Sequence, residues 1–131
     1  MINISAPEAR VLIVDDSIAN RKFLKSLLEG TKIQIDSVSS GPEAIDFLRR
    51  NTYDIVFLDI MMPRMSGPEI LWNIEREELV SEDTAIIALS TNDYEDAGEQ
   101  YRARGFTDYL PKPVKVDALV DVLKKYLHSW S

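Results

Sequence analysis

The sequence predicts an α/β fold in which a five-stranded parallel sheet is covered by helices on both faces. Five short runs rich in Val, Ile and Leu alternate along the chain with segments of amphipathic, helical spacing. Three of these runs contain almost no polar residue, which is typical of strands buried on both faces. Because right-handed crossovers place a helix between successive parallel strands, this alternation favours a doubly wound sheet.

The expected strands are the apolar runs themselves, which lie at residues 10–14, 33–38, 54–58, 85–90 and 106–110. A common strand order for such a sheet is 2-1-3-4-5, in which the first and third strands are neighbours. Ligands bind such sheets at the carboxyl ends of the strands, where the direction of winding reverses. The residues that follow the first and third strands are therefore the first candidates for a functional site.

The first two helices are predicted from an apolar stripe and from residues typical of helix ends. The first follows from apolar residues between positions 19 and 28 and ends at Gly30. The second begins after Gly41 and Pro42, because proline is favoured in the first turn of a helix. Ile45 then faces inward.

The remaining helices differ in the strength of their signals. The third begins in the segment 66–69, where Ser, Gly, Pro and Glu form a capping box with a proline in the first turn. The last has apolar residues at helical spacing between positions 116 and 127. The fourth, expected at 94–104, contains Gly98, which costs about 1 kcal/mol relative to alanine. Its apolar stripe is thin, with only Ala97 and Tyr101, so this helix should be the most easily shifted.

Length and composition indicate one soluble globular domain over residues 1–131, with a core at about 10–128. A chain of 131 residues buries roughly two thirds of its unfolded surface and leaves no room for a second domain. The composition is ordinary, with 45% hydrophobic and 28% charged residues.

Charge and cysteine content exclude several classes of function. The 15 Lys and Arg against 22 Asp and Glu give a net charge of −7, which disfavours direct binding to nucleic acid or anionic membrane. The chain has no cysteine, so disulfides, thiol catalysis and thiolate zinc sites are excluded. No signal peptide or membrane span is recognisable, and we expect a cytoplasmic protein.

Three aspartates follow the two strands that should be neighbours. Asp15 and Asp16 come directly after the first strand, and Asp59 comes directly after the third. Taken separately, each residue is explained as a helix or turn cap. Two carboxylates about 4 Å apart repel by about 4 kcal/mol at an effective dielectric near 20, a cost that a divalent cation removes. Carboxylate oxygens suit Mg²⁺, whereas the single His128 lies near the carboxyl terminus as an expected solvated residue.

Two more polar residues follow the fourth and fifth strands. Ser90 ends the fourth strand, and Lys112 comes shortly after the fifth. Lys112 precedes Pro113, whose ring moves its neighbour out of helical geometry and makes a cis peptide possible. We call the edge of the sheet where these strands end the rim. Three aspartates, one Mg²⁺ and one lysine have formal charges of −3, +2 and +1, so the rim is expected to be neutral overall.

The motifs at these strand ends resemble the receiver domain of two-component response regulators, the family that includes the bacterial chemotaxis regulator. That family has the flavodoxin-like, doubly wound fold predicted above. The resemblance spans residues 11 to 114, and four segments carry it in order: VLIVDDS, DIVFLDIMMPRMSG, AIIALST and DYLPKPV.

The resemblance implies a phospho-accepting role for the site. Asp59 would take a phosphoryl group from a phosphohistidine on a sensor histidine kinase or phosphotransfer protein. Asp16 would bind Mg²⁺ directly, Asp15 directly or through water, and the backbone carbonyl of Met61 would be a further ligand. Lys112 would pair with the phosphoryl oxygens. Such transfer requires positioning and charge neutralisation rather than a protein general base.

The resemblance also implies a switch. Ser90 corresponds to the hydroxyl that reorients toward the phosphoryl group, and Tyr109 to the aromatic residue that turns inward with it. The surface formed by the fourth helix, fifth strand and fifth helix would then bind a downstream protein, because a phosphoryl group biases an equilibrium between states of similar energy. The chain would act as a signalling component rather than as an enzyme on external substrates.

The sequence departs from common members of the family at a few positions. Ser66 stands where aspartate or asparagine is common before the following glycine, and Ser90 stands where threonine is common. Met61 and Asn92 occupy positions that tune the lifetime of the phosphoryl group. A free-standing regulator, a phosphorelay shuttle and a part of a larger protein are all consistent with the sequence.

Three alternatives stay open. A magnesium-dependent phosphatase with an aspartate nucleophile would need a second aspartate two residues later, where Met61 stands. A flavin-binding module would need a glycine- or hydroxyl-rich phosphate loop after the first strand, where Asp15 and Asp16 would repel phosphate. A degenerate receiver would serve only as a docking surface.

Overall fold

The computed structural model describes residues 2–91 and 96–131 and has the α/β architecture expected from the sequence. All strand pairs are parallel, and the strand order is β2-β1-β3-β4-β5, as predicted. The strands are β1 (Arg10–Val14), β2 (Gln34–Val38), β3 (Ile55–Asp59), β4 (Ala85–Ser90) and β5 (Asp108–Pro111).

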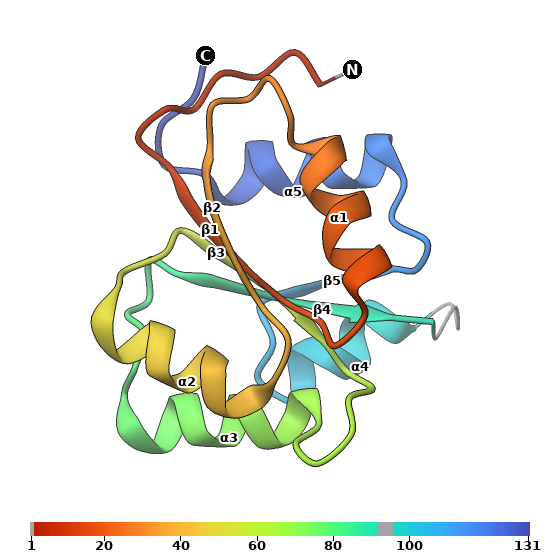
Figure 1. Ribbon diagram of the computed structural model, residues 1–131. Helices are drawn as coiled ribbons and strands as arrows, with labels where there is room; N and C mark the ends of the chain where they lie inside the picture. The colour runs from red at the N-terminus through yellow and green to blue at the C-terminus, as the bar shows by residue number, and fades with distance from the viewer. Residues whose placement is uncertain (1, 92–95) are drawn as a thin grey trace.

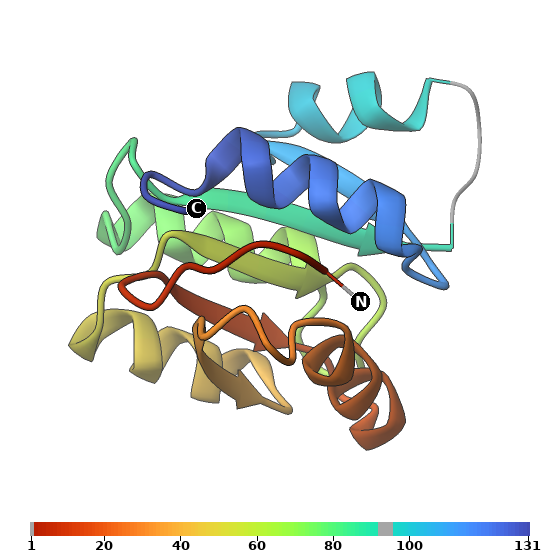
Figure 2. The same cartoon turned by 90° about the horizontal axis from the view of Figure 1, so that it is seen from above.

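Five helices cover the two faces of the sheet. Helices α1 and α5 lie on one face, and α2, α3 and α4 lie on the other (Figure 1; Figure 2 shows the layers from above). None of the helices in the described part of the chain has the length and apolar character to cross a membrane. The helices are α1 (Ile18–Leu27), α2 (Gly41–Arg50), α3 (Gly67–Glu77), α4 (Ala97–Ala103) and α5 (Val116–Tyr126).

The central strands are apolar throughout because both of their faces are buried. Side chains alternate across a strand, so Val11 and Ile13 of β1 pack in the cluster beneath α1 and α5. Leu12 and Val14 pack in the opposite cluster, beneath α2, α3 and α4. Uninterrupted apolar runs thus supply two cores from one strand, which explains the missing polar alternation in the sequence.

Serine side chains fix the starts of two helices near the site. The Ser40 hydroxyl accepts a hydrogen bond from the backbone N–H of Glu43 at 3.3 Å, and the Ser66 hydroxyl accepts one from Glu69 at 3.4 Å. Each helix also has a proline in its first turn. These bonds satisfy N–H groups that have no partner within the helix.

Helix α4 is shorter than the sequence predicts. It spans Ala97–Ala103 rather than 94–104. Residues 94 and 95, and Asn92, lie outside the described residues. The residue before the helix, Asp96, makes no side-chain capping bond, and a helix of this length without a cap depends on tertiary packing for its stability.

The apolar core extends further toward the amino terminus than the expected 10–128. Ile2, Ile4 and Ala6 are buried and join the cluster beneath α1 and α5. Backbone bonds of 2.9 Å run in both directions between Ser5 and Ser131, so the carboxyl-terminal residue lies beside the amino-terminal segment.

Candidate functional site

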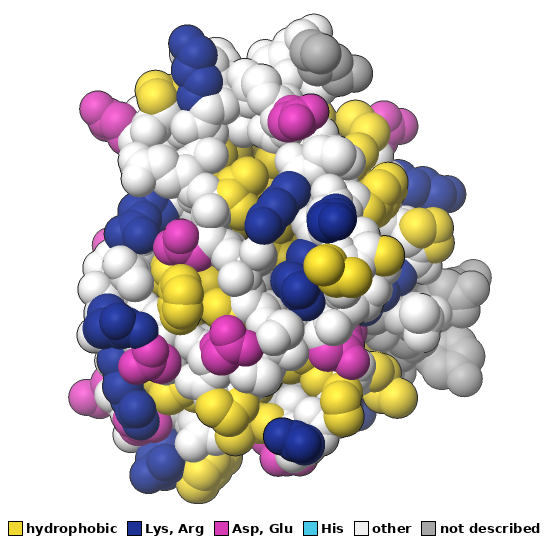
Figure 3. Space-filling view, in the orientation of Figure 1, with side chains coloured by type: hydrophobic (Ala, Val, Ile, Leu, Met, Phe, Trp, Pro, Cys, Tyr) yellow, Lys and Arg dark blue, Asp and Glu magenta, His cyan; other side chains and the backbone are white. Residues whose placement is uncertain are grey.

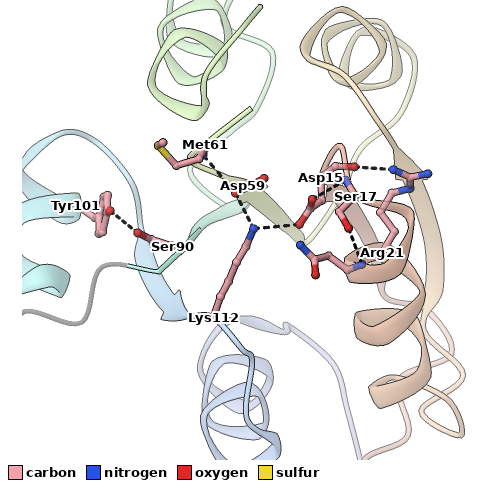
Figure 4. A network of polar contacts seen from close by, with 9 residues as sticks. Asp15, Ser17, Arg21, Asp59, Met61, Ser90, Tyr101 and Lys112 are labelled. Carbon is pink, nitrogen blue, oxygen red and sulfur yellow. Dashed lines mark hydrogen bonds and ion pairs between the residues drawn. The ribbon is translucent and has the colours of Figure 1, made fainter. Parts of the chain in front are cut away.

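The sheet brings the acidic residues together at the carboxyl ends of β1 and β3. These strands are paired in register, with Val14 opposite Leu58. Asp15 therefore emerges beside Asp59, and both side chains lie at the rim shown in Figure 4. The chain direction and strand order alone thus produce the predicted cluster.

The three carboxylates form a compact group of oxygen ligands. One oxygen each from Asp15, Asp16 and Asp59 lies within 4.8 Å of the other two. Asp15 and Asp59 are buried, with 1% and 2% of their surfaces exposed, whereas Asp16 is exposed. The spacing is close to the diameter of the first coordination sphere of Mg²⁺, about 4.2 Å. Hard donors near this spacing, open to solvent on one side, fit a magnesium ion that keeps some of its waters.

Lys112 supplies the positive charge of the rim. Its Nζ lies 2.8 Å from Oδ1 of Asp59 and 3.3 Å from Oδ2 of Asp15. The Lys112 backbone N–H donates to the carbonyl of Ser90 at 2.7 Å, and the Lys112–Pro113 peptide bond is cis. The ammonium group faces the carboxylates and bridges the two buried ones.

Burial and neighbouring charges shift the pKa values of this pair. Burial raises the pKa of Asp59 above its ordinary value, the charge of Asp15 adds to the rise, and the hydrogen bond from Lys112 opposes it. Burial acts to lower the pKa of Lys112, but the hydrogen bond and charge of Asp59, with the charge of Asp15, leave it raised. Lys112 therefore stays protonated at neutral pH, and the ionised form of Asp59 carries a cost in free energy.

Two residues that the sequence interpretation did not single out hold Asp15 in place. The Ser17 backbone N–H donates to Oδ1 of Asp15 at 2.9 Å, and Nη1 of Arg21 donates to the Asp15 carbonyl at 2.7 Å. Ser17 is also the N-cap of α1 and accepts from the N–H of Asn20. A serine directly before a helical stripe is a recognisable cap signal, whereas the Arg21 contact depends on the tertiary fold.

Met61 lies at the open side of the rim. Its backbone N–H donates to Oδ1 of Asp59 at 3.3 Å, and its side chain is largely exposed. The role of its carbonyl as a magnesium ligand stays a prediction.

Ser90 lies at the end of β4, next to β3, and is 5% exposed. It accepts a hydrogen bond of 2.7 Å from the hydroxyl of Tyr101 on α4, as Figure 4 shows. Tyr101 was predicted only as part of an apolar stripe. Tyr109, the predicted switch aromatic, is half-buried on β5 and stacks on Tyr101, with ring centroids 5.5 Å apart.

Gly67 allows α3 to begin against the end of β3. A Cβ at this position would lie 2.8 Å from the Asp59 carbonyl oxygen and 2.9 Å from the Cα of Ile60, both backbone atoms. We expect Gly67→Ala to lower the free energy of unfolding by about 1–3 kcal/mol and to displace the Asp59 backbone. Chemical denaturation measures the loss.

The matched control for this substitution is Gly98→Ala on α4. There the added Cβ would meet only the flexible end of Arg102, at 3.2 Å, and alanine favours the helix by up to about 1 kcal/mol. We expect this variant to be at least as stable as wild type. Equal stability losses at the two positions would contradict the close approach assigned to Gly67.

The raised pKa of Asp59 predicts how stability depends on pH without magnesium. A carboxyl whose pKa is raised by folding favours the folded state below its ordinary pKa, here 3.8, and this contribution is lost as pH rises through the folded value. Compared with Asp59→Asn, wild type should therefore become less stable from acid toward neutral pH. Urea unfolding in EDTA at several pH values measures this difference. If the stability of wild type relative to Asp59→Asn instead increases with pH, then the hydrogen bond from Lys112 lowers the pKa of Asp59 by more than burial raises it.

Comparison with known proteins identifies the family of this chain. The sequence model of the response regulator receiver domain matches residues 11–124. The chain belongs to this family. The receiver is 31% identical over 118 residues to the polar-differentiation response regulator DivK of Brucella ovis, covering 89% of this chain and 94% of DivK. It is 34% identical over 122 residues to hybrid signal transduction histidine kinase L of Dictyostelium discoideum, covering 89% of this chain but only 7% of that kinase.

Solved structures show the same receiver fold. One is the receiver domain of sensor histidine kinase PA1611 from Pseudomonas aeruginosa, with a magnesium ion in its active site cleft; the TM-score is 0.79 at 26% identity, over 92% of this chain and 98% of that one. Another is the receiver domain of Saccharomyces cerevisiae Ssk1, crystallised with the histidine phosphotransfer protein Ypd1. Its TM-score is also 0.79 at 26% identity, over 92% of this chain and 89% of the matched chain.

Proposed function

We propose that this receiver accepts a phosphoryl group on Asp59 from a phosphohistidine and changes its surface in response. One observation carries the proposal: the Lys112 ammonium lies 2.8 Å from a buried Asp59 carboxylate that shares a cluster of oxygen ligands with Asp15 and Asp16. A purely structural ion pair would not need two further carboxylates beside it, because like charges at this distance oppose folding.

The acidic cluster would hold Mg²⁺. Asp16 is exposed and would bind the ion directly, Asp15 directly or through water, with Asp59 and the Met61 carbonyl as further ligands. When bound, the ion would neutralise charge on the incoming phosphoryl oxygens. The formal charges of the aspartates and Lys112 add to −3 + 1 = −2, which a divalent cation balances.

The residues of the chain would position the reactants. A carboxylate oxygen of Asp59 would attack phosphorus; the P–N bond to the donor imidazole breaks as the P–O bond forms, and the imidazole retains the bond electrons. Lys112, already beside Asp59, would pair with the transferred oxygens, and the N–H of Met61 would hold Asp59 in place. None of these steps requires a protein base.

Ser90 and Tyr109 would then respond to phosphorylation. The phosphoryl group adds charge to a neutral rim, and the Ser90 hydroxyl would donate to it. Helix α4 connects to Ser90 through Tyr101, and Tyr109 stacks on the same ring. The surface of α4, β5 and α5 would change as a result and bind a downstream protein.

The donor would be a sensor histidine kinase or a phosphotransfer protein. The hybrid kinase relative and the structure of a receiver with Ypd1 support this choice. Around the rim, Ile18 and Phe23 of α1 expose apolar surface, and Lys and Arg side chains gather over α1 (Figure 3). On a protein with a net charge of −7, such a patch suits docking of another protein rather than of a small molecule.

Incubation with Mg²⁺ and a small acyl phosphate tests the proposal. Intact mass spectrometry should show one added phosphoryl group on wild type, lost on mild alkaline treatment as an acyl phosphate is, and none on Asp59→Asn. A matched control is Asp121→Asn, an exposed carboxylate on α5, which should be modified like wild type. No adduct on wild type, or equal adducts on wild type and Asp59→Asn, would overturn the proposal.

A further inference from the structure

Strand β2 lies at an edge of the sheet. It pairs with β1 on one side, and in the described part of the chain no strand pairs with its other side. The N–H of Gln34 and the carbonyl of Val38 form hydrogen bonds of 2.9 and 3.2 Å toward the β1 side. Backbone groups alternate in direction along a strand, so the N–H and C=O groups of Ile35 and Ser37 point outward. An open edge of this kind is a template for pairing with another chain.

A groove runs between α1 and this edge strand. It consists of two hollows of about 890 and 560 Å³ that adjoin one another, because Lys22 and Lys25 of α1 line both. Ile35 lines the first hollow and Ser37 the second. The residues with outward-pointing backbone groups therefore lie along the groove. Since β2 has five residues, the groove suits an extended segment of similar length.

Cations outnumber carboxylates in the groove, although the chain as a whole has a net charge of −7. Lys22 and Lys25 are three residues apart and therefore lie on one face of α1. No lysine of the groove forms an ion pair with a described residue. The charged side chains that line the groove are Arg21, Lys22, Lys25, Lys32, Glu29 and Glu43.

The space-filling view agrees with this distribution of charge. The β2 edge of the sheet faces the viewer in Figure 1, as the view from above in Figure 2 shows, and Figure 3 has the same orientation as Figure 1. Lys and Arg side chains gather over α1 on this face. A cationic surface beside an open strand edge favours an acidic partner, because opposite charges steer association and select among partners.

The geometry of a sheet indicates how such a partner would bind. A strand added to β2 would lie about 4.8 Å from it, and every second side chain would point to the α1 side. Those side chains would meet Lys22 and Lys25, so acidic residues are favoured at alternate positions. Main-chain hydrogen bonds to Ile35 and Ser37 would supply affinity, and the lysines would supply selectivity.

We propose that the groove between α1 and β2 binds an extended acidic segment of a partner protein, which adds to the sheet as a strand beside β2. The inference goes beyond the proposed function and does not depend on phosphorylation of Asp59. Lysines beside an edge strand also occur where they only prevent edge-to-edge aggregation. The two roles differ in their consequences, because only the proposed one requires an acidic segment to bind.

Titration of isotope-labelled, unphosphorylated protein with a short capped peptide, in which Glu alternates with Val, tests the proposal. By NMR we expect the amide signals of Ile35 and Ser37 to shift and their hydrogen exchange to slow, because their N–H groups become bonded. Lys22→Glu/Lys25→Glu should raise the dissociation constant about ten-fold, since attraction at two exposed positions becomes repulsion.

Lys115→Glu/Lys124→Glu is the matched control, because it changes the net charge equally at two exposed positions at the start of and within α5. This variant should bind the peptide like wild type. Thermal unfolding of both double variants reports any loss of structure. Equal weakening in the two variants would show that net charge, rather than the groove, governs binding and would overturn the inference.

Two methylated peptides test the strand pairing itself. N-methylation at every Glu removes the N–H groups on one side of the added strand, and N-methylation at every Val removes those on the other. One peptide should lose binding and the other keep it, and which one does so depends on the direction of the added strand. Equal binding by both, or no shift at residues 35 and 37, would overturn the inference. Self-association of Lys22→Gln/Lys25→Gln, without peptide binding by wild type, would show that the lysines only protect the edge.

Discussion

Replacement of Lys112 by methionine is expected to slow phosphorylation of Asp59 by a factor of about 10²–10³, the usual effect of removing one donor that stabilises developing charge. The ammonium lies 2.8 Å from Asp59 and 3.3 Å from Asp15, and no other Lys or Arg in the described part of the chain forms an ion pair with either carboxylate. Methionine keeps the length of the side chain but removes its charge. Initial rates of adduct formation by intact mass, at saturating Mg²⁺, measure the effect.

Two variants control this experiment. Lys115→Met removes an exposed ammonium three residues further along the chain and should leave the rate unchanged. Lys112→Arg keeps the charge but changes its geometry, and its rate should fall between those of wild type and Lys112→Met. Thermal unfolding at saturating Mg²⁺ checks that each variant is folded. A Lys112→Met protein that is phosphorylated at the wild-type rate would show that this contact is only structural.

Magnesium is expected to stabilise the protein strongly, and removal of its ligands should abolish the effect. An ion that binds only the folded state adds about 2.7 kcal/mol at a concentration 100 times its dissociation constant, which for a domain of this size raises Tm by roughly 10 °C. The physical reason is relief of repulsion among Asp15, Asp16 and Asp59, whose oxygens lie within 4.8 Å. Differential scanning calorimetry with Mg²⁺ and with EDTA measures the shift.

The double variant Asp15→Asn/Asp16→Asn should melt at the same temperature with and without Mg²⁺. Asp121→Asn, with its exposed carboxylate on α5, should keep the full stabilisation. A metal-dependent shift of similar size in the double variant would place the bound ion away from this rim. No shift in wild type would contradict a magnesium site altogether.

The sequence predicts the rim because the rim depends on little more than strand order and chain direction. Apolar runs buried on both faces identify β1 and β3, and the residues that directly follow or end them are Asp15 and Asp59. Once β1 and β3 are paired in parallel, Val14 lies opposite Leu58 and the carboxylates meet. The position of Lys112 follows from the same logic, since β5 ends at the same edge of the sheet.

Features that depend on tertiary packing could not be predicted in this way. In the sequence, Tyr101 is one apolar position in a weak stripe, and only the packing of α4 on the sheet brings its hydroxyl to Ser90. The Arg21 contact with the Asp15 carbonyl likewise depends on the tertiary fold. The amino-terminal residues have no periodic pattern, yet Ile2 and Ile4 are buried in the cluster beneath α1 and α5. The chemical roles of the site residues stay predictions, which phosphorylation of the protein and its variants tests.

Chemical identification of the modified residue tests the central claim most directly. Wild-type protein would be phosphorylated with a small acyl phosphate and Mg²⁺, reduced with borohydride to convert the acyl phosphate into a stable alcohol, digested, and sequenced by tandem mass spectrometry. We predict that the reduced residue is Asp59, with Asp15 and Asp16 unmodified. Reduction at Asp15, at Asp16 or at a carboxylate outside the rim would contradict it.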